Sequence, residues 1–363
     1  MTRAAVRDWL LSRGAVLALA AVAAYVQIRH GYGRSPVRGG ATGLFVWDGD
    51  WYRDIAVHGY GGAGRESLRF FPLVPLLARP FVLLGPAAAS AAVLVVANAS
   101  ALAYALGLSR LARLEGLGDE VGERAAWLAL WNPAAFVLVL PYAEATAAAL
   151  AVWCLYALRR RAWLAAAALG FLCGLARPIG LLVALPALVE AARGWRSAPW
   201  RDVARRVAAA GGGPAGCAAY LAWCGLRYGD PLLPFRVQQR GDLRGGVVVW
   251  PGRALGNAWL ALVHHGRVTT ALRLVWVPLV LALLVLVARR LPASYTAFAG
   301  AVVVLAVGTP RLASFERYSM SAFPLVLVAA SLRSRHARAA LRVACGLGLA
   351  GYGILAFAST YVP

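Results

Sequence analysis

Two carboxylates lie close together in the segment Trp47-Asp48-Gly49-Asp50-Trp51-Tyr52, just after the first hydrophobic stretch of the chain. Acids are scarce in this protein, because only 15 of its 363 residues are Asp or Glu. A carboxylate beside a membrane is costly unless it pairs with a cation or takes part in chemistry. Asp48 and Asp50 are therefore the first candidates for a general base.

The segment around these acids is predicted to form a short helix at the membrane surface. Trp47, Trp51 and Ile55 recur at helical spacing, and Gly59 supplies a stop signal. Asp is also a common N-cap residue. From the spacing alone, capping and catalysis are therefore equally consistent roles for Asp48.

Asp50 has a simpler alternative role. It shares a helix face with Asp54 at i, i+4, and Arg53 is adjacent, so the three residues can form a solvated ion-pair network. Asp48 and Asp50 are two residues apart and point in different directions. Only one of them need face a reaction centre.

A third acid, Glu144, follows Pro141-Tyr142 at the outer end of two short apolar segments. An acid at that depth needs a partner, and pairing with Arg177 or Arg317 is favoured somewhat over direct catalysis. We expect Tyr142 and Glu144 to shape a site rather than to carry the reaction.

Three arginines, Arg177, Arg311 and Arg317, stand next to apolar segments on one predicted side. A guanidinium offers a phosphate two charge-assisted hydrogen bonds in one plane, so these residues are candidate phosphate ligands. The alternative is that their long side chains simply reach the membrane interface. His58 and the pair His264-His265 have no acid or cysteine partner at ligand spacing, so the sequence predicts no metal site.

The composition is that of a polytopic, all-α membrane protein. Hydrophobic residues make up 61% of the chain, against roughly 45 to 50% in soluble domains, and mean hydropathy is +0.66. All 37 basic residues are arginines, and the net charge is +22. The arginines gather in short clusters between apolar stretches, which is typical of cytoplasmic loops and argues against a nucleic-acid partner.

Apolar stretches of about 20 residues can cross a bilayer, and the sequence predicts about eleven of them. With the N-terminus in the cytoplasm and the first span kept as an anchor, the arginine clusters fall on the cytoplasmic side at every turn. The predicted spans are 10–28, 88–108, 125–141, 143–158, 162–176, 179–192, 207–226, 271–288, 292–308, 318–332 and 343–360.

This topology places two long loops, 29–87 and 227–270, outside the cell, and we expect a single domain over 1–363. The proline-rich segment 70–84 is expected to be interfacial or re-entrant, with a span kinked at Pro80 as the alternative. The run Gly211-Gly212-Gly213-Pro214 lacks the setting of a phosphate-binding loop. We interpret it as a site of close helix packing.

Taken in order, these features resemble the PIG-V family of GPI mannosyltransferases and its bacterial relatives, which belong to the GT-C class of membrane glycosyltransferases. The resemblance runs along most of the chain, and its most distinctive parts are Trp47-Asp48-Gly49 and Phe70-Phe71-Pro72-Leu73. The other parts are Ile55-Ala56, Gly59-Tyr60, Pro75, Asn132-Pro133, Pro141-Tyr142 with Glu144, Arg177-Pro178 with Gly180, Gly229-Asp230-Pro231, Arg317-Tyr318 and Phe323-Pro324.

The resemblance implies a GT-C-type bundle that moves mannose from a polyprenyl-phosphate-mannose donor to a hydroxyl of a glycolipid or glycan acceptor. It implies inversion at the anomeric carbon and no nucleotide sugar, and it maps the base onto Asp48. Asp50 and Trp51 are expected to support the site or contact the acceptor. A carboxylate base suits this chemistry because the acceptor hydroxyl must lose its proton as it attacks.

The chain departs from the eukaryotic members at Pro178-Ile179, where they tend to have Ser-Asn, and at Ala143, where they have Ser or Thr before the acid. These differences leave the reaction type in place and the acceptor open. The alternative functions are a transporter or flippase for a lipid-linked or small substrate, and a membrane subunit without catalytic activity.

Overall fold

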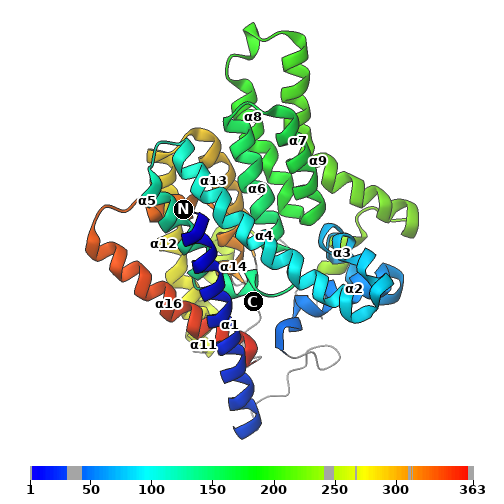
Figure 1. The fold of residues 1–363 in the computed structure, drawn as a ribbon, viewed down its shortest axis with the longest axis vertical. Helices are drawn as coiled ribbons and strands as arrows, with labels where there is room; N and C mark the ends of the chain where they lie inside the picture. The colour runs from blue at the N-terminus through cyan, green and yellow to red at the C-terminus, as the bar shows by residue number, and fades with distance from the viewer. Residues whose placement is uncertain are drawn as a thin grey trace. The chain divides into compact units, whose positions relative to one another are not determined.

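The computed structural model of the chain describes residues 2–30, 43–240, 249–265, 268–309, 312 and 314–358 (Figure 1). Within these ranges the chain is helical and forms no strand, which confirms the all-α prediction for the described part. The α-helices are α1 (Thr2–His30), α2 (Asp48–Ala63), α3 (Leu73–Ala78), α4 (Pro86–Leu114), α5 (Asp119–Trp131), α6 (Glu144–Arg159), α7 (Trp163–Ala176), α8 (Ala184–Ala192), α9 (Trp200–Tyr228), α10 (Leu233–Gln238), α11 (Pro251–His265), α12 (Val268–Arg290), α13 (Ala293–Val307), α14 (Phe315–Met320), α15 (Pro324–Ala330) and α16 (Arg335–Phe357). The 3-10 helices are η2 (Gly43–Phe45), η3 (Arg65–Arg69), η4 (Arg79–Leu84), η5 (Ala135–Leu138), η6 (Pro178–Val183) and η7 (Trp195–Ser197).

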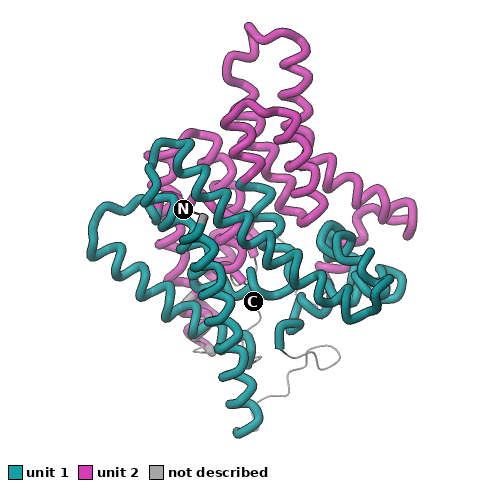
Figure 2. The backbone as a smooth tube through the Cα atoms, viewed as in Figure 1, with its two compact units in different colours: residues 1–152, 329–363 teal, residues 153–328 magenta. Residues whose placement is uncertain are grey.

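The helices belong to two compact units, coloured teal and magenta in Figure 2. Unit 1 comprises residues 1–152 and 329–363, and unit 2 comprises residues 153–328. In unit 1, α1 packs against α16 and both helices contact α5, so the two ends of the chain share one unit. In unit 2, α7 and α9 form the most extensive contact between described helices. The single domain expected over 1–363 stays a prediction.

Among the described residues, three helices, all of them in unit 1, are long and apolar enough to cross a membrane. They are the 27-residue stretch Arg3–Arg29 of α1, the 29 residues of α4 and the 23 residues of α16. Only 22%, 44% and 33% of their most apolar windows are buried inside the protein. Much of each apolar surface therefore remains uncovered by the described protein, as expected for helices in contact with lipid. These three helices contain the predicted spans 10–28, 88–108 and most of 343–360.

Several other predicted spans are interrupted. Segment 125–141 contains the end of α5 at Trp131 and then η5, segment 179–192 contains η6 and α8, and segment 318–332 contains α14 and α15. For 125–141 and 318–332 the predictions of single helices are wrong, because Pro133 and Pro324 follow residues where helical hydrogen bonding ends. Segment 179–192 lies within one short helical stretch, Pro178–Ala192, which changes from 3-10 to α-helical geometry. Hydropathy averaged over an apolar run does not register such breaks. About eleven spans therefore stay a prediction.

The segment 70–84 contains no helix of span length, and its interfacial position stays a prediction. It divides into α3 and η4, each 6 residues long, and neither approaches the length of about 20 residues that a span requires. Arg79, the first residue of η4, donates hydrogen bonds through Nη1 to the carbonyls of Ala56 and Val57 at 3.2 and 3.3 Å. Within the first loop, η4 is thus hydrogen-bonded to the helix that contains Ala56 and Val57.

In unit 2, helices α7 and α9 touch through glycines. A Cβ placed on Gly212 would lie 2.4 Å from the carbonyl oxygen of Ala167, and one on Gly216 would lie 2.0 Å from that of Phe171. A Cβ placed on Gly211, in contrast, would meet no heavy atom of another helix within 4 Å. The interpretation of the glycine run as a close-packing site is therefore confirmed.

A buried carboxylate joins α6, α8 and α13 in unit 2. Glu190 is 6% exposed and accepts hydrogen bonds from Arg159 Nη1 at 3.1 Å and Ser294 Oγ at 2.6 Å. Arg193 forms an ion pair with the same carboxylate at 3.2 Å. Two guanidiniums and a hydroxyl compensate the desolvation of this charge, so Glu190 has a structural role.

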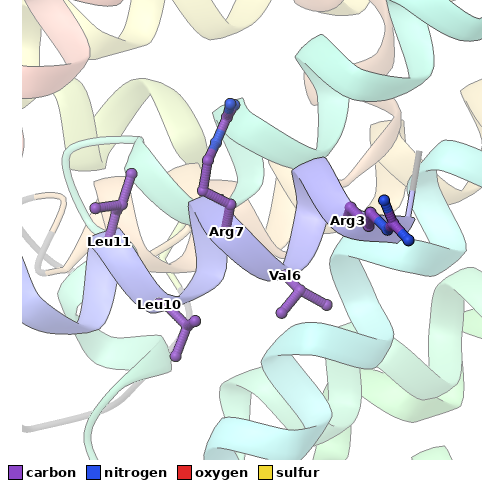
Figure 3. A pocket seen from close by; sticks show the side chains of 5 residues that line it. All are labelled: Arg3, Val6, Arg7, Leu10 and Leu11. Atoms are coloured by element: carbon purple, nitrogen blue, oxygen red, sulfur yellow. The ribbon is translucent and has the colours of Figure 1, made fainter.

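A hollow of about 450 Å³ lies beside the N-terminal turns of α1 (Figure 3). Arg7 and Leu11 point to one side of the helix and Val6 and Leu10 to the other, while Arg3 lies nearest the start of the chain. The lining is almost entirely apolar and holds no acid or histidine. Basic residues followed by apolar ones are typical of the end of a membrane span, and this hollow is not a candidate active site.

The contact between α7 and α9 predicts opposite effects at neighbouring glycines. Gly212→Ala should lower the free energy of unfolding by about 1 to 3 kcal/mol, because the new methyl group collides with the backbone of α7. Gly211→Ala should raise it by up to about 1 kcal/mol, because alanine is the better helix former and meets open space. Thermal unfolding of the two purified variants measures this difference. A Gly212→Ala variant at least as stable as the Gly211→Ala control would contradict the described packing.

Candidate active site

Two residues of the Trp47-Asp48-Gly49 segment are bonded to distant parts of unit 1. The indole Nε1 of Trp47 donates a hydrogen bond to the carbonyl of Ala356, near the end of α16, at 3.1 Å. The backbone amide of Asp48 donates to the hydroxyl oxygen of Tyr142 at 3.3 Å. Tyr142 in turn donates its hydroxyl proton to the carbonyl of Val46 at 3.3 Å. Trp47 and Asp48 are therefore both held by residues that are far away in the sequence.

The third residue of the segment, Gly49, allows a close approach of backbone to side chain. A Cβ on Gly49 would lie 3.0 Å from Cγ of Pro141 and 3.3 Å from the carbonyl oxygen of Leu44. Any larger residue here would have to displace the ring of Pro141. The glycine thereby brings Pro141 and Tyr142 against the start of α2.

Asp48 does not occupy the N-cap position of α2. The N-cap residue is Trp47, which makes no side-chain capping bond, and Asp48 is the first residue within the helix. Trp47 has φ 58° and ψ −123°, a conformation that is strained for a bulky side chain. The N-cap position predicted for Asp48 therefore falls on Trp47, while capping and catalysis by the Asp48 carboxylate both stay predictions. The strained turn shifts the helix start by one residue, which the sequence pattern alone does not reveal.

The two acids of the segment have different surroundings. Asp50 is buried, at 8% exposed, and pairs with Arg53 one turn later. Asp54 pairs with His58 at 2.7 Å. The ion pair between Asp50 and Arg53 within α2 is therefore confirmed, with its acid buried rather than solvated. Asp48, by contrast, is half-buried at the start of the helix.

Helix α2 is positioned by an apolar cluster that includes residues of α3 and α4 and Ala143, the residue before α6. Trp51 stacks on Phe70 with ring centroids 5.8 Å apart, and Ile55 is 2% exposed in the same cluster. Gly59 interrupts the helix with φ 70° and ψ 173°, and helical turns resume beyond it. The predicted stop at Gly59 is thus a kink that turns the chain toward η3.

Arg69 is a candidate site residue that the motif analysis did not single out. Its guanidinium carbon lies 5.3 Å from the ring centroid of Trp51 and 4.8 Å from that of Phe70, so the cation stacks against both aromatic rings. In the sequence, the feature that could have indicated Arg69 is its position directly before the Phe70-Phe71-Pro72-Leu73 motif. Arg69 places a fixed positive charge beside the helix that begins with Asp48.

Tyr142 and Glu144 lie where α6 begins. Tyr142 is fully buried, and Glu144 is 6% exposed and forms the first residue of α6. A carboxylate at the first turn of a helix is stabilised by the helix dipole. Both residues thus belong to unit 1, as do Asp48, Asp50 and Trp51. A site formed by these five residues requires that they belong to one unit.

The predicted phosphate ligands belong to unit 2. Arg177 ends α7 in an extended conformation and precedes η6, and Arg317 lies in α14 and is 5% exposed. Both η6 and α14 contact α13. Arg311 lies outside the described residues.

Glu316 is a second residue that the motif analysis missed, although it directly precedes Arg317. It is 1% exposed, and its Oε2 lies 3.9 Å from Nε of Arg273. Burial raises the pKa of the Glu316 carboxyl, and the neighbouring Arg273 opposes this rise. The start of α14 thus holds an acid and an arginine side by side, both buried.

Strained backbone accompanies the candidate site segments. Among the described residues, the non-glycine positions with positive φ are Trp47, Arg161, Leu312 and Ser314. Trp47 directly precedes Asp48, while Leu312 and Ser314 lie shortly before Arg317. Strain of this kind is retained at functional sites, where the surrounding structure holds it in place.

No protein-family model matches the chain, and no curated protein matches it. The resemblance to the PIG-V family therefore stays a prediction from the ordered motifs.

The burial of Glu316 predicts a specific pH dependence of stability. Because its folded-state pKa is raised, the carboxyl binds its proton more tightly in the folded protein, so its contribution to stability is full below the ordinary glutamate pKa and is lost as pH rises through the raised value. Between about pH 4 and pH 8, the melting temperature of the wild type should therefore fall relative to that of Glu316→Gln.

Glu120→Gln is the matched control, since the side chain of Glu120 is 89% exposed. Its pH profile should follow the wild type. Parallel profiles for wild type and Glu316→Gln would show that Glu316 is not buried as described.

Proposed function

We propose that the protein is an inverting membrane glycosyltransferase, with mannose as the transferred sugar and a polyprenyl phosphate as its carrier. The acceptor is a hydroxyl of a glycolipid or glycan on the extracytoplasmic face. The proposal places about eleven spans of a GT-C-type bundle in the membrane, with the N-terminus in the cytoplasm. No nucleotide sugar and no metal cofactor enter the reaction as proposed.

The observation that carries the proposal is the position of Asp48. It is half-buried, it is the first residue of α2, and it follows a strained Trp47 that is bonded to α16. A carboxylate on a backbone segment that distant residues hold, and that the solvent still reaches, suits a general base. Asp50 is buried and paired with Arg53, which suits a supporting role.

In the proposed step, the acceptor oxygen attacks the anomeric carbon as Asp48 takes the hydroxyl proton. The bond between that carbon and the phosphate oxygen breaks, and its electron pair leaves with the polyprenyl phosphate. Attack opposite to the leaving group inverts the anomeric carbon. The leaving phosphate is already an anion, so it requires cations rather than a general acid.

Arginines supply those cations in the proposal. Arg317 and Arg177 are assigned to the donor phosphate, with Arg311 as a further candidate, because a guanidinium matches phosphate geometry. Tyr142 orients the backbone of Asp48 through the 3.3 Å hydrogen bond. Trp51, Asp50 and Glu144 shape the acceptor side, as their shared unit supports.

The test is transfer of radiolabelled mannose from its polyprenyl phosphate carrier by purified variants supplied with a membrane lipid extract. Asp48→Asn keeps the shape of the side chain and removes the base, so transfer should fall by about 10² to 10⁴-fold while the melting temperature changes little. Asp50→Asn is the matched control. It removes a carboxylate two residues away and should lower stability more than the rate of transfer, because it leaves Arg53 without its partner.

An Asp48→Asn variant that transfers sugar at the wild-type rate would overturn the base assignment. A larger loss of activity in Asp50→Asn than in Asp48→Asn, at equal stability, would move the role to Asp50.

A further inference from the structure

A small hollow in unit 1 is lined by arginines and an indole, away from the first loop. Arg124 and Trp127 contribute to it from α5, and Arg338 and Arg342 from the first two turns of α16. The hollow encloses about 20 Å³, which is room for a single water molecule. Any larger group would therefore bind at the mouth, within reach of the arginine side chains.

The positive charge at this hollow exceeds the nearby negative charge. Arg124 is engaged within unit 1, because its Nε donates to the carbonyl of Ala330 at 2.9 Å and its Nη1 to Oε2 of Glu120 at 3.2 Å. For Arg338 and Arg342, the described part of the chain contains no ion-pair partner. The guanidinium of Arg342 stacks instead near Trp127, 5.9 Å from its ring centroid.

This arrangement costs energy unless an anion is bound. Arg338 and Arg342 are four residues apart on one helix, a spacing at which like charges destabilise the helix. Arg338 also lies in the first turn of α16, where the helix dipole disfavours a cation. An anion at the mouth of the hollow would relieve both effects.

We propose that this hollow binds the phosphate of an anionic phospholipid. The guanidiniums of Arg338 and Arg342 would donate charge-assisted hydrogen bonds to the phosphate, and Trp127 would lie at the level of the headgroups, where tryptophan is enriched. The acyl chains would follow α16, on which Val343 is 61% and Leu347 is 71% exposed. These apolar neighbours favour a lipid over free phosphate.

The position of the hollow along α16 suits a headgroup site. Arg338 and Ala356 lie near opposite ends of this candidate span, separated by about 27 Å at 1.5 Å per residue. That separation is close to the roughly 30 Å hydrocarbon thickness of a bilayer. The carbonyl of Ala356 binds Trp47, so the proposed lipid site and the candidate active site mark opposite ends of one helix. The inference rests on α16 crossing the membrane and not on the proposed activity.

Native mass spectrometry of the purified full-length protein in nonionic detergent tests the proposal. The probes are dioctanoyl phosphatidylglycerol, dioctanoyl phosphatidylcholine and inorganic phosphate, each titrated against the wild type and Arg338→Gln/Arg342→Gln. Phosphatidylglycerol should bind the wild type most tightly, and the double variant should bind it on the order of tenfold or more weakly. Melting temperatures confirm that both proteins are folded.

The matched control is Arg201→Gln/Arg205→Gln on α9. Like the test variant, it removes two arginines, one of which stacks on a tryptophan, since the Arg201 guanidinium lies 5.5 Å from the ring centroid of Trp200. It should bind phosphatidylglycerol as the wild type does. An equal loss in the control, an unchanged affinity in the double variant, equal binding of phosphatidylcholine, or displacement of the lipid by millimolar inorganic phosphate would each overturn the proposal. If the double variant does not fold, Arg342→Gln alone, an exposed position, takes its place with the same expected direction.

Discussion

The close approach of Gly49 to Pro141 is the contact on which the rest of the candidate site depends. With only 3.0 Å between a hypothetical Cβ and the proline ring, no other residue fits without displacement. The approach brings Tyr142 within hydrogen-bond distance of the Asp48 amide. It also accompanies the strained conformation of Trp47, which occupies the N-cap position, so that Asp48 is the first residue of α2. Local strain at Trp47 is tolerated because the indole is bonded to α16 and α2 is packed in an apolar cluster.

Within unit 1, environment separates acids that look alike in the sequence. Asp50 is buried and paired with Arg53, Glu144 is buried at a helix start, and Asp48 is half-buried as the first residue of α2. Carboxylates whose surroundings differ in this way take different chemical roles. Arg69, whose guanidinium lies against the rings of Trp51 and Phe70, adds a fixed cation to the same unit. Of these three acids, the proposed chemistry assigns the reacting proton to Asp48, the one that is only half-buried.

Sequence patterns predicted the features that depend on local spacing. The helix after Trp47, the interruption at Gly59 and the glycine contact at Gly212 all follow from residue type at fixed intervals. The sequence did not predict features that depend on tertiary contacts. The positive φ of Trp47 arises where distant segments meet, and the stacking of Arg69 requires η3 to fold back onto α2. Apolar runs were also extended through Pro133 and Pro324, because hydropathy does not distinguish one long helix from two short ones.

The central claim is that the protein changes its substrate covalently. The most direct measurement reconstitutes the wild-type protein in vesicles containing mannose-labelled polyprenyl phosphate and a membrane lipid extract, and then separates the labelled products. The account predicts that label leaves the carrier and appears in a new glycolipid or glycan with the opposite anomeric configuration. Label that stays on the carrier with every extract, even if the carrier crosses the membrane, would contradict the account and favour transport.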